Sequence, residues 1–481
     1  MIMGKKDMGL KIGLEIHQQL DTGKLFCRCP SIIRTDKPDI RIKRKLNPVA
    51  GETGKIDIAA AYEAEKKKTF VYEGYSDTNC LIEYDESPPL EIDEEALKIA
   101  LQISLLLNAE PVNVSQVMRK TVINGSNTSG FQRTILIAKN GFVKVDGEKI
   151  TIPTIFLEED AAKEVSQSKD ETVFRLDRLG IPLVEISTAP EIKNKEQAKQ
   201  VALKIGDILR ACKVKRGIGT IRQDVNLSIR NGARTEIKGV QEPSLIPKTI
   251  EKEIERQQEL LKKKKKIEAT VRDALENGET RYMRPLPGAA RMYPETDIQL
   301  VKISDKMIEE IKNNLPALRE DIISDLKKLG LSEEYAGIIT KENKFQEFMN
   351  LINIKVDKNI IAKALILWPK EIASRENIAN EIVSQKLSFD EIKRILEQVE
   401  KGKISESSIK SVMTSIAKEE KTDIKKASSG DIEKEVKKII EENKGATFNA
   451  LMGIAMSKLK GKADGKEIAG ILKKHVKQGK F

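Results

Sequence analysis

The chain has 481 residues, enough for two or three domains that each bury a hydrophobic core. Hydrophobic residues make up 39%, and no apolar run reaches the length of a membrane-spanning helix, so we expect no membrane association. The first residues lack the apolar core of a signal peptide, which favours a cytoplasmic protein. The 85 basic and 74 acidic residues give a net charge of +11, which suits a polyanion such as RNA without proving one.

Residues 11–17 alternate strictly between apolar and polar side chains. The isoleucine and leucine side chains would face one side of a strand and Glu15 and His17 the other, so one face is expected to be buried. The polar face would then carry a carboxylate beside an imidazole, and His17 is one of only two histidines in the chain. Taken alone, this pattern also fits a solvated strand face.

The four cysteines are too few and too scattered for a disulfide framework. Cys27 and Cys29 form a Cys-x-Cys pair, which could begin a zinc site, but zinc needs four ligands and no second pair follows. Cys80 is isolated in the sequence, and Cys212 lies on the apolar stripe of a helix predicted over 194–213. We therefore interpret the cysteines as structural or reactive thiols.

A polar loop and an acidic turn follow one another in the first half of the chain. The loop at 125–130 (GSNTSG) could cradle phosphate, although it lacks the ending of a P-loop and also fits a plain turn. Apolar segments between residues 133 and 157, separated by one Asn-Gly and one Asp-Gly dipeptide, predict an antiparallel meander. The meander ends at three successive carboxylates, Glu158, Glu159 and Asp160, for which a solvated turn is the alternative.

The segment 221–238 predicts a second pair of strands with carboxylates on one face. We favour a three-residue loop with a bulge, which pairs Ser228 with Glu236 and puts both polar rows on the same face. This register leaves Asp224 and Glu236 four residues apart, roughly 13 Å along the strands at about 3.3 Å per residue. Another strand must therefore complete any cation site.

The rest of the pattern is mainly helical. Helices are predicted over 93–107 and, with a high charge, over 249–279, and from about residue 304 the helical pattern continues to the end. We predict domain boundaries near residue 304 and near 384–388. The block 451–481 contains eight lysines and only two acidic residues, which makes it the best local candidate for phosphate contact.

These residues together favour one kind of chemistry. Aspartate and glutamate side chains with one histidine suit a hard cation such as Mg²⁺, which prefers oxygen ligands and brings substrate phosphates with it. With the lysine-rich end, this points toward phosphoryl transfer on or beside a nucleic acid. The sequence has no Gly-x-Ser-x-Gly elbow, and two histidines leave little room for a Cys–His amidase dyad, so another chain would have to release any amide nitrogen.

Several long motifs resemble, in the same order, those of the B/E subunits of tRNA-dependent amidotransferases. They are GLEIHQQL at 13–20, LEEDAAK at 157–163, DRLGIPLVE at 177–185 and the hairpin at 222–238. The resemblance covers essentially the whole chain. The segments GSNTSGFQRT at 125–134, EIKGVQ at 236–241 and MRPLPGAARMYPETDI at 283–298 resemble the archaeal E branch more than the bacterial B branch.

The resemblance implies an α+β fold in three domains. A mainly antiparallel β cradle with helices is expected over 1–302, an all-helical domain over 303–385, and a small helical, tRNA-binding tail domain of the YqeY type over 386–481. The implied reaction activates Glu-tRNA(Gln) with ATP at the side-chain carboxylate to give a γ-phosphoryl ester. Ammonia from a partner glutaminase then displaces the phosphate, and the product is Gln-tRNA(Gln).

The resemblance also implies the site residues and the partners. The implied catalytic residues are Glu15, His17, Glu159, Asp224 and Glu236, and all of them except Asp224 are expected to bind Mg²⁺. Contacts to ATP are expected from Ser126, Asn127, Thr128, Ser129, Arg178 and Lys238. The expected partner is an asparaginase-like amidase of the D-subunit type, in a cytoplasmic hetero-oligomer that acts on tRNA(Gln) charged with glutamate.

Two departures and two alternatives accompany the resemblance. The archaeal branch usually carries an insertion resembling part of an aspartyl-tRNA synthetase, whereas residues 261–282 here lead directly to the MRPLPG stretch, so we expect the insertion to be missing. Some B subunits bind zinc through a set of cysteines. That set is incomplete in this chain, which argues against a zinc site here. The alternatives are a bacterial-type B subunit that also serves Asp-tRNA(Asn) and a non-catalytic tRNA-binding scaffold.

Overall fold

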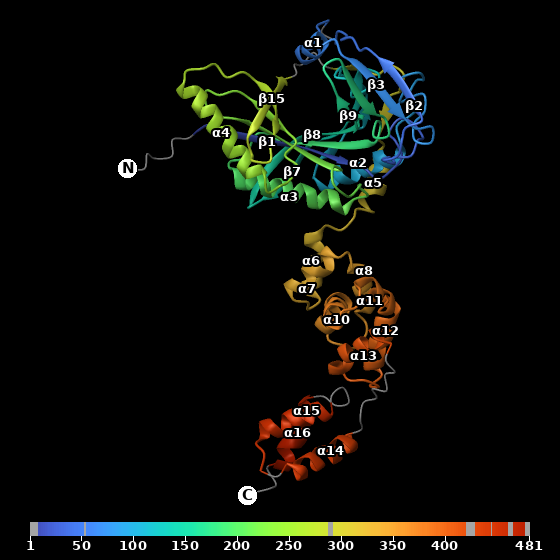
Figure 1. The fold of residues 1–481 in the computed structure, drawn as a ribbon, viewed down its shortest axis with the longest axis vertical. Helices are drawn as coiled ribbons and strands as arrows, with labels where there is room; N and C mark the ends of the chain where they lie inside the picture. The colour runs from blue at the N-terminus through green and yellow to red at the C-terminus, as the bar shows by residue number, and fades with distance from the viewer. Residues whose placement is uncertain are drawn as a thin grey trace. The chain divides into compact units, whose positions relative to one another are not determined.

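The computed structural model describes residues 8–51, 54–286, 292–419, 429–443, 445–459 and 465–476. The chain divides into two compact units, Met1–Pro316 and Ala317–Phe481, and each is described by itself (Figure 1). In its described residues the first unit combines β-sheets with helices, and the second is helical. This arrangement confirms the expected α+β class.

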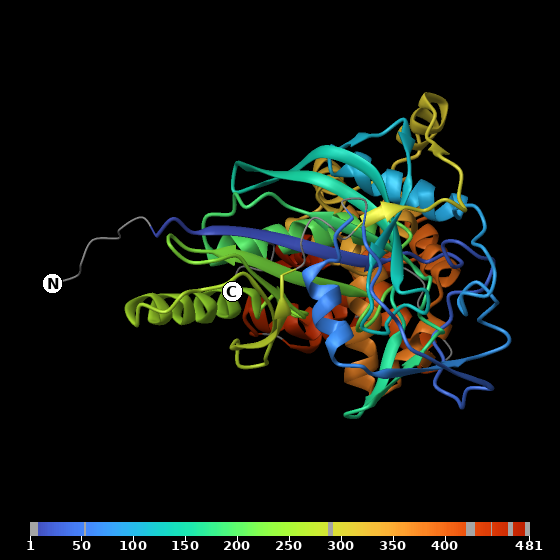
Figure 2. The same cartoon turned by 90° about the horizontal axis from the view of Figure 1, so that it is seen from above.

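The largest sheet in the described part of the first unit has 11 strands. Its strand order is β15-β14-β13-β12-β1-β11-β8-β7-β6-β16, and β4 pairs with β7. Strand β1 is antiparallel to both of its neighbours and crosses the unit as the dark blue strand of Figure 2. The bounds are β1 (Lys11–Gln19), β4 (Glu110–Pro111), β6 (Val117–Thr121), β7 (Phe131–Val145), β8 (Glu148–Glu159), β11 (Pro182–Ser187), β12 (Ile221–Ser228), β13 (Thr235–Lys238), β14 (Thr270–Ala274), β15 (Thr280–Pro285) and β16 (Met292–Pro294).

One face of this sheet is covered by helices. Ile12, Leu14 and Ile16 of β1 are fully or almost fully buried, as their alternation predicts. The covering helices are α2 (Glu94–Leu106), α3 (Lys195–Ala211) and α4 (Ile246–Lys262). Helix α3 contacts β1 and β7, α2 contacts β7 and β8, and α4 contacts β12. The polar side chains of the same strands therefore lie on the opposite face of the sheet.

The starts of two of these helices follow from their capping residues. The Asp93 side chain accepts a hydrogen bond from the backbone N–H of Ala96 at 2.8 Å, and the Asn194 side chain accepts one from Gln197 at 2.8 Å. Such caps satisfy backbone donors that have no partner inside the helix. The helices predicted over 93–107 and 194–213 are confirmed to within two residues at each end.

Two smaller sheets lie in the described part of the first unit. A four-stranded sheet has the order β2-β3-β10-β9, and β17 pairs with β5. The four-stranded sheet has its own aromatic core, in which the rings of Tyr72 and Phe174 stack 6.2 Å apart. The bounds are β2 (Ile40–Arg44), β3 (Thr69–Gly74), β5 (Val114–Ser115), β9 (Lys163–Gln167), β10 (Glu171–Arg175), β17 (Val301–Lys302), α1 (Ile58–Glu65) and α5 (Asp305–Lys312).

The predicted meander is only partly correct. The Asp146-Gly147 dipeptide makes the turn between β7 and β8, but β7 runs through Asn140-Gly141 without turning. A Cβ atom at Gly141 would lie 2.8 Å from the Cβ of Ala109, so glycine is required here for close packing. The predicted helix over 249–279 is also too long, because α4 ends at Lys262 and the following residues pair with β13 as strand β14.

The described residues of the second unit form two separate hydrophobic clusters. One lies within residues 326–417 and the other within residues 432–472. The helices around the first are α6 (Arg319–Lys328), α7 (Glu333–Lys341), α8 (Phe345–Leu351), α9 (Lys358–Ala362), a π-helical turn at Lys363–Leu367, α10 (Trp368–Glu376), α11 (Asn380–Lys386), α12 (Phe389–Glu400), a short 3₁₀ turn at Glu406–Ser408 and α13 (Ile409–Ala417). Those around the second are α14 (Ser429–Glu442), α15 (Phe448–Lys458) and α16 (Gly465–Val476).

Packing within the chain defines two compact units, Met1–Pro316 and Ala317–Phe481. Helix α5 contacts α2 and lies within the first unit, which extends to Pro316. The cluster within 326–417 contains residues on both sides of the boundary expected at 385/386. The division into 1–302, 303–385 and 386–481 stays a prediction about domains. Among the described residues, none of the helices combines the length and apolar character needed to cross a membrane.

The packing of the helical cluster within 326–417 predicts that truncation of one buried isoleucine lowers the free energy of unfolding. Ile339 of α7 is fully buried there, whereas Ile382 of α11 is 44% exposed. We expect Ile339→Ala to lower the free energy of unfolding of this cluster by about 2–5 kcal/mol, because the substitution leaves a cavity.

Urea unfolding can be followed through the fluorescence of Trp368, the only tryptophan in the chain, which packs against this cluster. Ile382→Ala is the matched control and should shift the midpoint little. Equal shifts for both variants would contradict the packing described here.

Candidate active site

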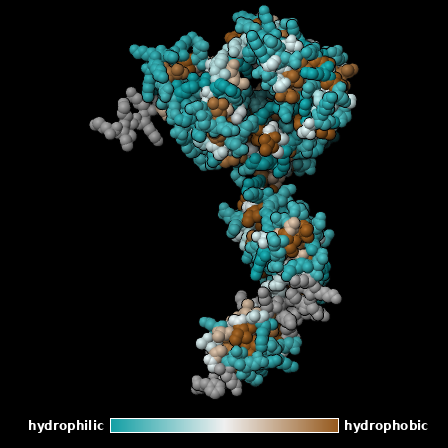
Figure 3. Space-filling model, in the orientation of Figure 1, coloured by the Kyte–Doolittle hydropathy of each residue, from teal (hydrophilic) through white to brown (hydrophobic). Residues whose placement is uncertain are grey.

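A row of acidic residues crosses the polar face of the large sheet. In strand order they lie on β13, β12, β1, β11 and β8, and they are Glu236, Asp224, Glu15, Glu185 and Glu158. Glu15 is opposite Asp224 and His17 is opposite Glu185 in the antiparallel registers of β1. The row lines a cavity of about 630 Å³, which we call the cradle, and Figure 3 shows the first unit hollowed among hydrophilic residues.

His17 lies at the centre of this row. Its Nε2 atom is 3.4 Å from Glu15 Oε1 and 3.4 Å from Glu185 Oε2. Burial by itself lowers the pKa of His17, but the hydrogen bond and charge of Glu185 raise it more, so the pKa reaches about 9. The imidazole is therefore protonated at neutral pH. Burial, together with the nearby charge of Glu185, raises the pKa of Glu15 to about 7.

Two lysines balance the remaining negative charge. Lys238 Nζ lies 2.7 Å from Asp224 Oδ2 and 2.8 Å from Glu236 Oε1. Burial opposes the charge of Lys238, but these carboxylates hold its pKa well above the usual value. On the other side of His17, Lys120 Nζ pairs closely with Glu158 and lies 3.5 Å from Glu185. The cradle thus interleaves three cations, Lys238, His17 and Lys120, with its row of carboxylates.

The carboxylates could hold a hard cation. One ligand atom each of Glu15, His17 and Asp224 lies within 4.8 Å of the others, and the same holds for His17, Glu158 and Glu185. Carboxylate oxygens fit the ligand preference of Mg²⁺, whereas a histidine must first lose its proton. The residues present therefore fit a Mg²⁺ site that is based on Glu15 and Asp224.

The rim of the cradle adds positive charge. Arg222, Arg234 and Arg284 line it, and Arg222 Nη2 donates to Asp160 Oδ1 at 2.7 Å. Asp160 is fully buried and also accepts a hydrogen bond from the Gln19 side chain at 2.6 Å. Asp160 therefore orients Arg222 toward the cavity. Such an arginine can bind phosphate or carboxylate groups.

Glu159 does not belong to this row, contrary to the sequence-based expectation. It lines a second, smaller cavity, where its Oε2 atom is 3.4 Å from Arg133 Nη1. Side chains alternate along a strand, so Glu158 faces the cradle and Glu159 the opposite side. Burial raises the pKa of Glu159, although the charge of Arg133 counteracts this effect. The register of β8 against β11 decides which of the two neighbours faces the cradle.

The residues expected to contact ATP divide between the same two sides. Ser126 and Asn127 line the cradle, and Lys238 lies within it. Thr128 and Ser129 instead line the smaller cavity. Arg178 donates from Nε to the carbonyl of Ala161 at 2.7 Å and from Nη2 to that of Ala162 at 2.9 Å, and thus braces the backbone beside Asp160.

The hairpin register also differs from the predicted one. Glu236 pairs with Asn226 instead of Ser228. The connection is longer than expected, because the N–H of Arg230 donates to the carbonyl of Met8 and Asn231 adopts a left-handed φ of 63°. The shift by two residues brings Asp224 and Glu236 close enough for Lys238 to contact both, and both polar rows do lie on one face as predicted.

Several cradle residues were missed by the sequence reasoning. Glu185 lies within the DRLGIPLVE motif and alternates with buried neighbours, so its pattern offered a signal. Lys120 lies on a short strand with no distinctive pattern. Among the cysteines, Cys212 is buried at the end of α3 as expected, but Cys80 lies beside Cys27 and Cys29 and is not isolated.

Two family models match most of the chain. Residues 10–309 match the family model described as the GatB/GatE catalytic domain, and residues 346–476 match the one described as the GatB domain. The first unit, with its acidic cradle, is therefore a catalytic domain of this class. The chain belongs to the GatB/GatE family.

The chain is similar over nearly its full length to archaeal proteins that are named as the E subunit of glutamyl-tRNA(Gln) amidotransferase. The protein of Methanocaldococcus jannaschii is 37% identical, and the alignment covers 99% of this chain and 100% of that protein. Those of Sulfurisphaera tokodaii and Thermococcus sibiricus are 35% and 34% identical, with 98% of this chain and 99% and 98% of theirs covered. The alignment with the first spans 632 positions against 481 residues here, so that relative contains residues that this chain lacks.

The carboxylates around His17 predict that its imidazole loses its proton at a higher pH than an ordinary histidine. The folded-state pKa of about 9 exceeds the ordinary value of 6.5, so the ion pair of His17 with Glu185 stabilises the fold fully below about pH 6.5. This contribution is lost as the pH rises through about 9. NMR titration of the imidazole signals tests this, and His475→Gln assigns them because the chain has only two histidines.

Glu185→Gln is the control for the cause of the shift. It removes the charge that holds the proton but keeps the burial, so the pKa of His17 should fall below its wild-type value. A wild-type midpoint at or below pH 6.5 would show that the cradle does not hold an imidazolium.

Proposed function

We propose that this chain is the glutamate-activating subunit of a glutamyl-tRNA(Gln) amidotransferase. The γ-carboxylate of glutamate attached to tRNA(Gln) attacks the γ-phosphorus of ATP, and ADP leaves. Ammonia then displaces the phosphate from the phosphoryl ester and forms the amide of Gln-tRNA(Gln). The carboxylate needs this activation because its oxygen is a poor leaving group, whereas phosphate is a good one. The observation that carries the proposal is the charge-balanced cradle in a chain of the GatB/GatE family.

The side chains of the cradle suit the charges of this reaction. Mg²⁺, held by Glu15 and Asp224, would neutralise charge on the phosphates of ATP. Lys120, Lys238 and Arg222 present cations around the same cavity, where they can stabilise the transferring phosphoryl group. His17 holds its proton between two carboxylates and contributes a further positive charge. Electrostatic stabilisation of this kind is the main task of a phosphoryl-transfer site.

The ammonia is proposed to come from another protein of the same assembly. The relatives are named as E subunits, which designates a component of a larger enzyme. An asparaginase-like amidase of the D-subunit type would hydrolyse glutamine and pass ammonia to the cradle. We propose that the assembly is a cytoplasmic hetero-oligomer.

The end of the chain is proposed to contact tRNA. Helices α14, α15 and α16 pack around their own small cluster, and the block 451–481 carries eight lysines. Lysines on a separate helical cluster suit phosphate contacts that position a nucleic acid without reading its sequence.

Substitution of Glu236 tests the activation step. Glu236→Gln keeps the volume but removes one of the two carboxylates that hold Lys238 in place. We expect ATP-dependent phosphorylation of Glu-tRNA(Gln) to fall by about two orders of magnitude or more, because a lost electrostatic element of this kind costs about 3 kcal/mol. Glutamine hydrolysis by the partner and tRNA binding should persist.

The assay follows the γ-phosphate of labelled ATP in the reconstituted complex, beside glutamine hydrolysis and filter binding. Glu242→Gln, an exposed residue further along the chain, is the matched control and should act like the wild type. Full phosphorylation by Glu236→Gln would favour the scaffold alternative. Equal use of Asp-tRNA(Asn) by the wild type would favour the bacterial-type alternative.

Truncation after Glu419 tests the tail. The cut leaves the cluster within 326–417 intact and removes α14, α15 and α16. We expect weaker tRNA binding and a flatter dependence of affinity on salt, since fewer phosphates are neutralised. Filter binding at several salt concentrations measures both quantities. An unchanged affinity and salt slope would remove the tail from the tRNA interface.

A further inference from the structure

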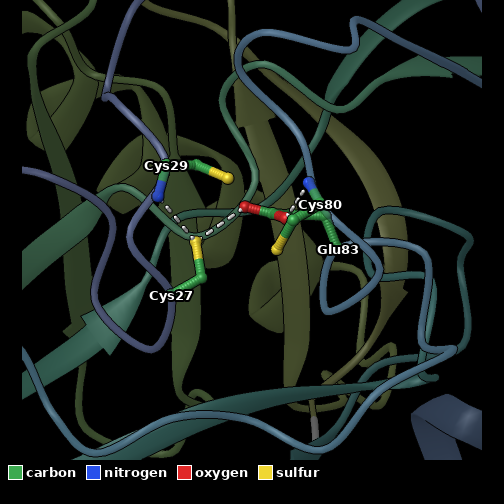
Figure 4. Close-up of side chains that lie close together, drawn as sticks. All are labelled: Cys27, Cys29, Cys80 and Glu83. Atoms are coloured by element: carbon green, nitrogen blue, oxygen red, sulfur yellow. Dashed lines mark hydrogen bonds between the residues drawn. The ribbon is translucent and has the colours of Figure 1, made fainter.

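Five consecutive lysines, Lys262–Lys266, lie at the end of helix α4, and we call them the lysine turn. All five are exposed, and they lie outside the set of residues that line the cradle. The buried Lys24 shows the contrast, because its Nζ atom lies 2.9 Å from the carboxylate of Glu83, which Figure 4 shows among three cysteines. The charge of the lysine turn is instead presented to solvent.

Few acidic side chains oppose this charge. Within the described residues, only two lysines of the turn have a carboxylate within 4 Å: Lys263 lies 3.9 Å from Glu259, and Lys266 lies 3.5 Å from Glu268. Both pairs are exposed, so solvent and salt screen them. The other three lysines have no such ion pair in the part of the chain that the structure describes, and they are Lys262, Lys264 and Lys265.

Backbone hydrogen bonds hold the turn in one defined shape. The N–H groups of Lys264 and Lys265 donate to the carbonyls of Leu261 and Leu260, each at 3.0 Å, which is the pattern of a Schellman motif. Lys264 adopts a left-handed φ of 52°, and glycine is the favoured residue at this position of the motif. The helix dipole favours cations only in the last turn of α4. The fold therefore does not explain why the lysines continue beyond the helix.

The lysine turn leads directly into the rim of the cradle. Strand β14 begins at Thr270, four residues after Lys266, which is at most about 14 Å of extended chain. The N–H of Thr270 donates to the carbonyl of Arg234 at 3.3 Å, and Thr270 is opposite Pro285 in the register of β14 and β15. Arg234 and Arg284, the neighbour of Pro285, both line the cradle. Positive charge thus continues from the cavity to the turn.

We propose that the lysine turn binds phosphates of the acceptor arm of tRNA while the 3′ end lies in the cradle. This inference rests on the proposed function, which brings an aminoacylated 3′ end to the site of activation. A cavity of about 630 Å³ has the size of a small-ligand site, so the base-paired arm behind the 3′ end stays outside, beside the rim. Exposed lysines there suit contacts to phosphates, which position a nucleic acid without reading its sequence.

An RNA backbone fits the lysine turn better than a protein surface does. Phosphates recur at short, regular intervals along a strand, so adjacent lysines can contact several of them. The core of a protein–protein interface is rich in apolar and aromatic residues and poor in lysine. The lysine turn consists of lysine alone.

Binding of uncharged tRNA(Gln) to the full-length chain tests the turn apart from any chemistry. The test variant carries three substitutions, Lys262→Gln, Lys264→Gln and Lys265→Gln. We expect its affinity at about 0.1 M salt to fall at least tenfold, because fewer phosphates are neutralised. The slope of log K against log salt should flatten by about two. A minihelix that contains only the acceptor arm and the 3′ end should show the same loss, and a loss seen with tRNA alone would overturn the assignment to the acceptor arm.

The matched control removes the same amount of charge elsewhere in the first unit. Its three substitutions replace exposed lysines of the β7–β8 hairpin by glutamine, at Lys139, Lys144 and Lys149. This control should keep the affinity and the salt slope of the wild type. An equal loss in both variants would overturn the inference, because only the total charge would then matter.

Lys264→Gly separates loss of contact from loss of folding. Glycine accepts the left-handed φ, so the thermal midpoint should not fall, whereas the affinity for tRNA should fall about threefold. Unchanged affinity would overturn the contact at Lys264.

The outcomes also distinguish this inference from the proposed function. Wild-type affinity and slope in the triple variant overturn the inference and leave the activation step, tested with Glu236→Gln, as it stands. A wild-type chain that binds no tRNA overturns both. A triple variant that binds tRNA normally but no longer assembles with the amidase overturns the RNA assignment in favour of a protein partner.

Discussion

The antiparallel register of β1 between β11 and β12 is the constraint on which the cradle depends. It places Glu15 opposite Asp224 and His17 opposite Glu185, so charges from three strands meet within a few ångströms. Helices cover the other face, and the apolar side chains of β1 fix the register, because a slip by one residue would expose them and bury the charges. The burial of Ile12, Leu14 and Ile16 therefore stabilises the fold and also fixes the positions of the polar side chains on the other face.

Such a concentration of carboxylates is tolerated because cations are interleaved with them. Lys238 joins Asp224 to Glu236, His17 joins Glu15 to Glu185, and Lys120 joins Glu158 to Glu185. An unpaired buried charge would cost several kcal/mol, whereas paired charges persist at much lower cost. The same arrangement suits a highly charged substrate, because acids can hold a hard cation while lysines and arginines meet phosphate oxygens. The charged side chains of the cradle thus hold one another in position through their ion pairs.

The two sides of the first unit present different ligand chemistries. Carboxylate oxygens dominate the cradle, whereas three sulfur atoms gather around Glu83 on the side of the smaller cavity. Strand β8 separates the two sides, with Glu158 facing one and Glu159 facing the other. The polar loop at 125–130 connects them, since Asn127 lines both cavities.

The sequence by itself determined the features that arise from local periodicity and capping. The alternation of β1 placed Glu15 and His17 on a polar face, and Asp93 and Asn194 marked the starts of two helices. Only the tertiary structure decided how separate strands align. It selected Glu158 over Glu159, paired Glu236 with Asn226, and brought Cys80 and Glu83 to Cys27 and Cys29. The physical reason is that local patterns set the direction of a side chain, whereas strand register and loop packing depend on burial of the whole sheet.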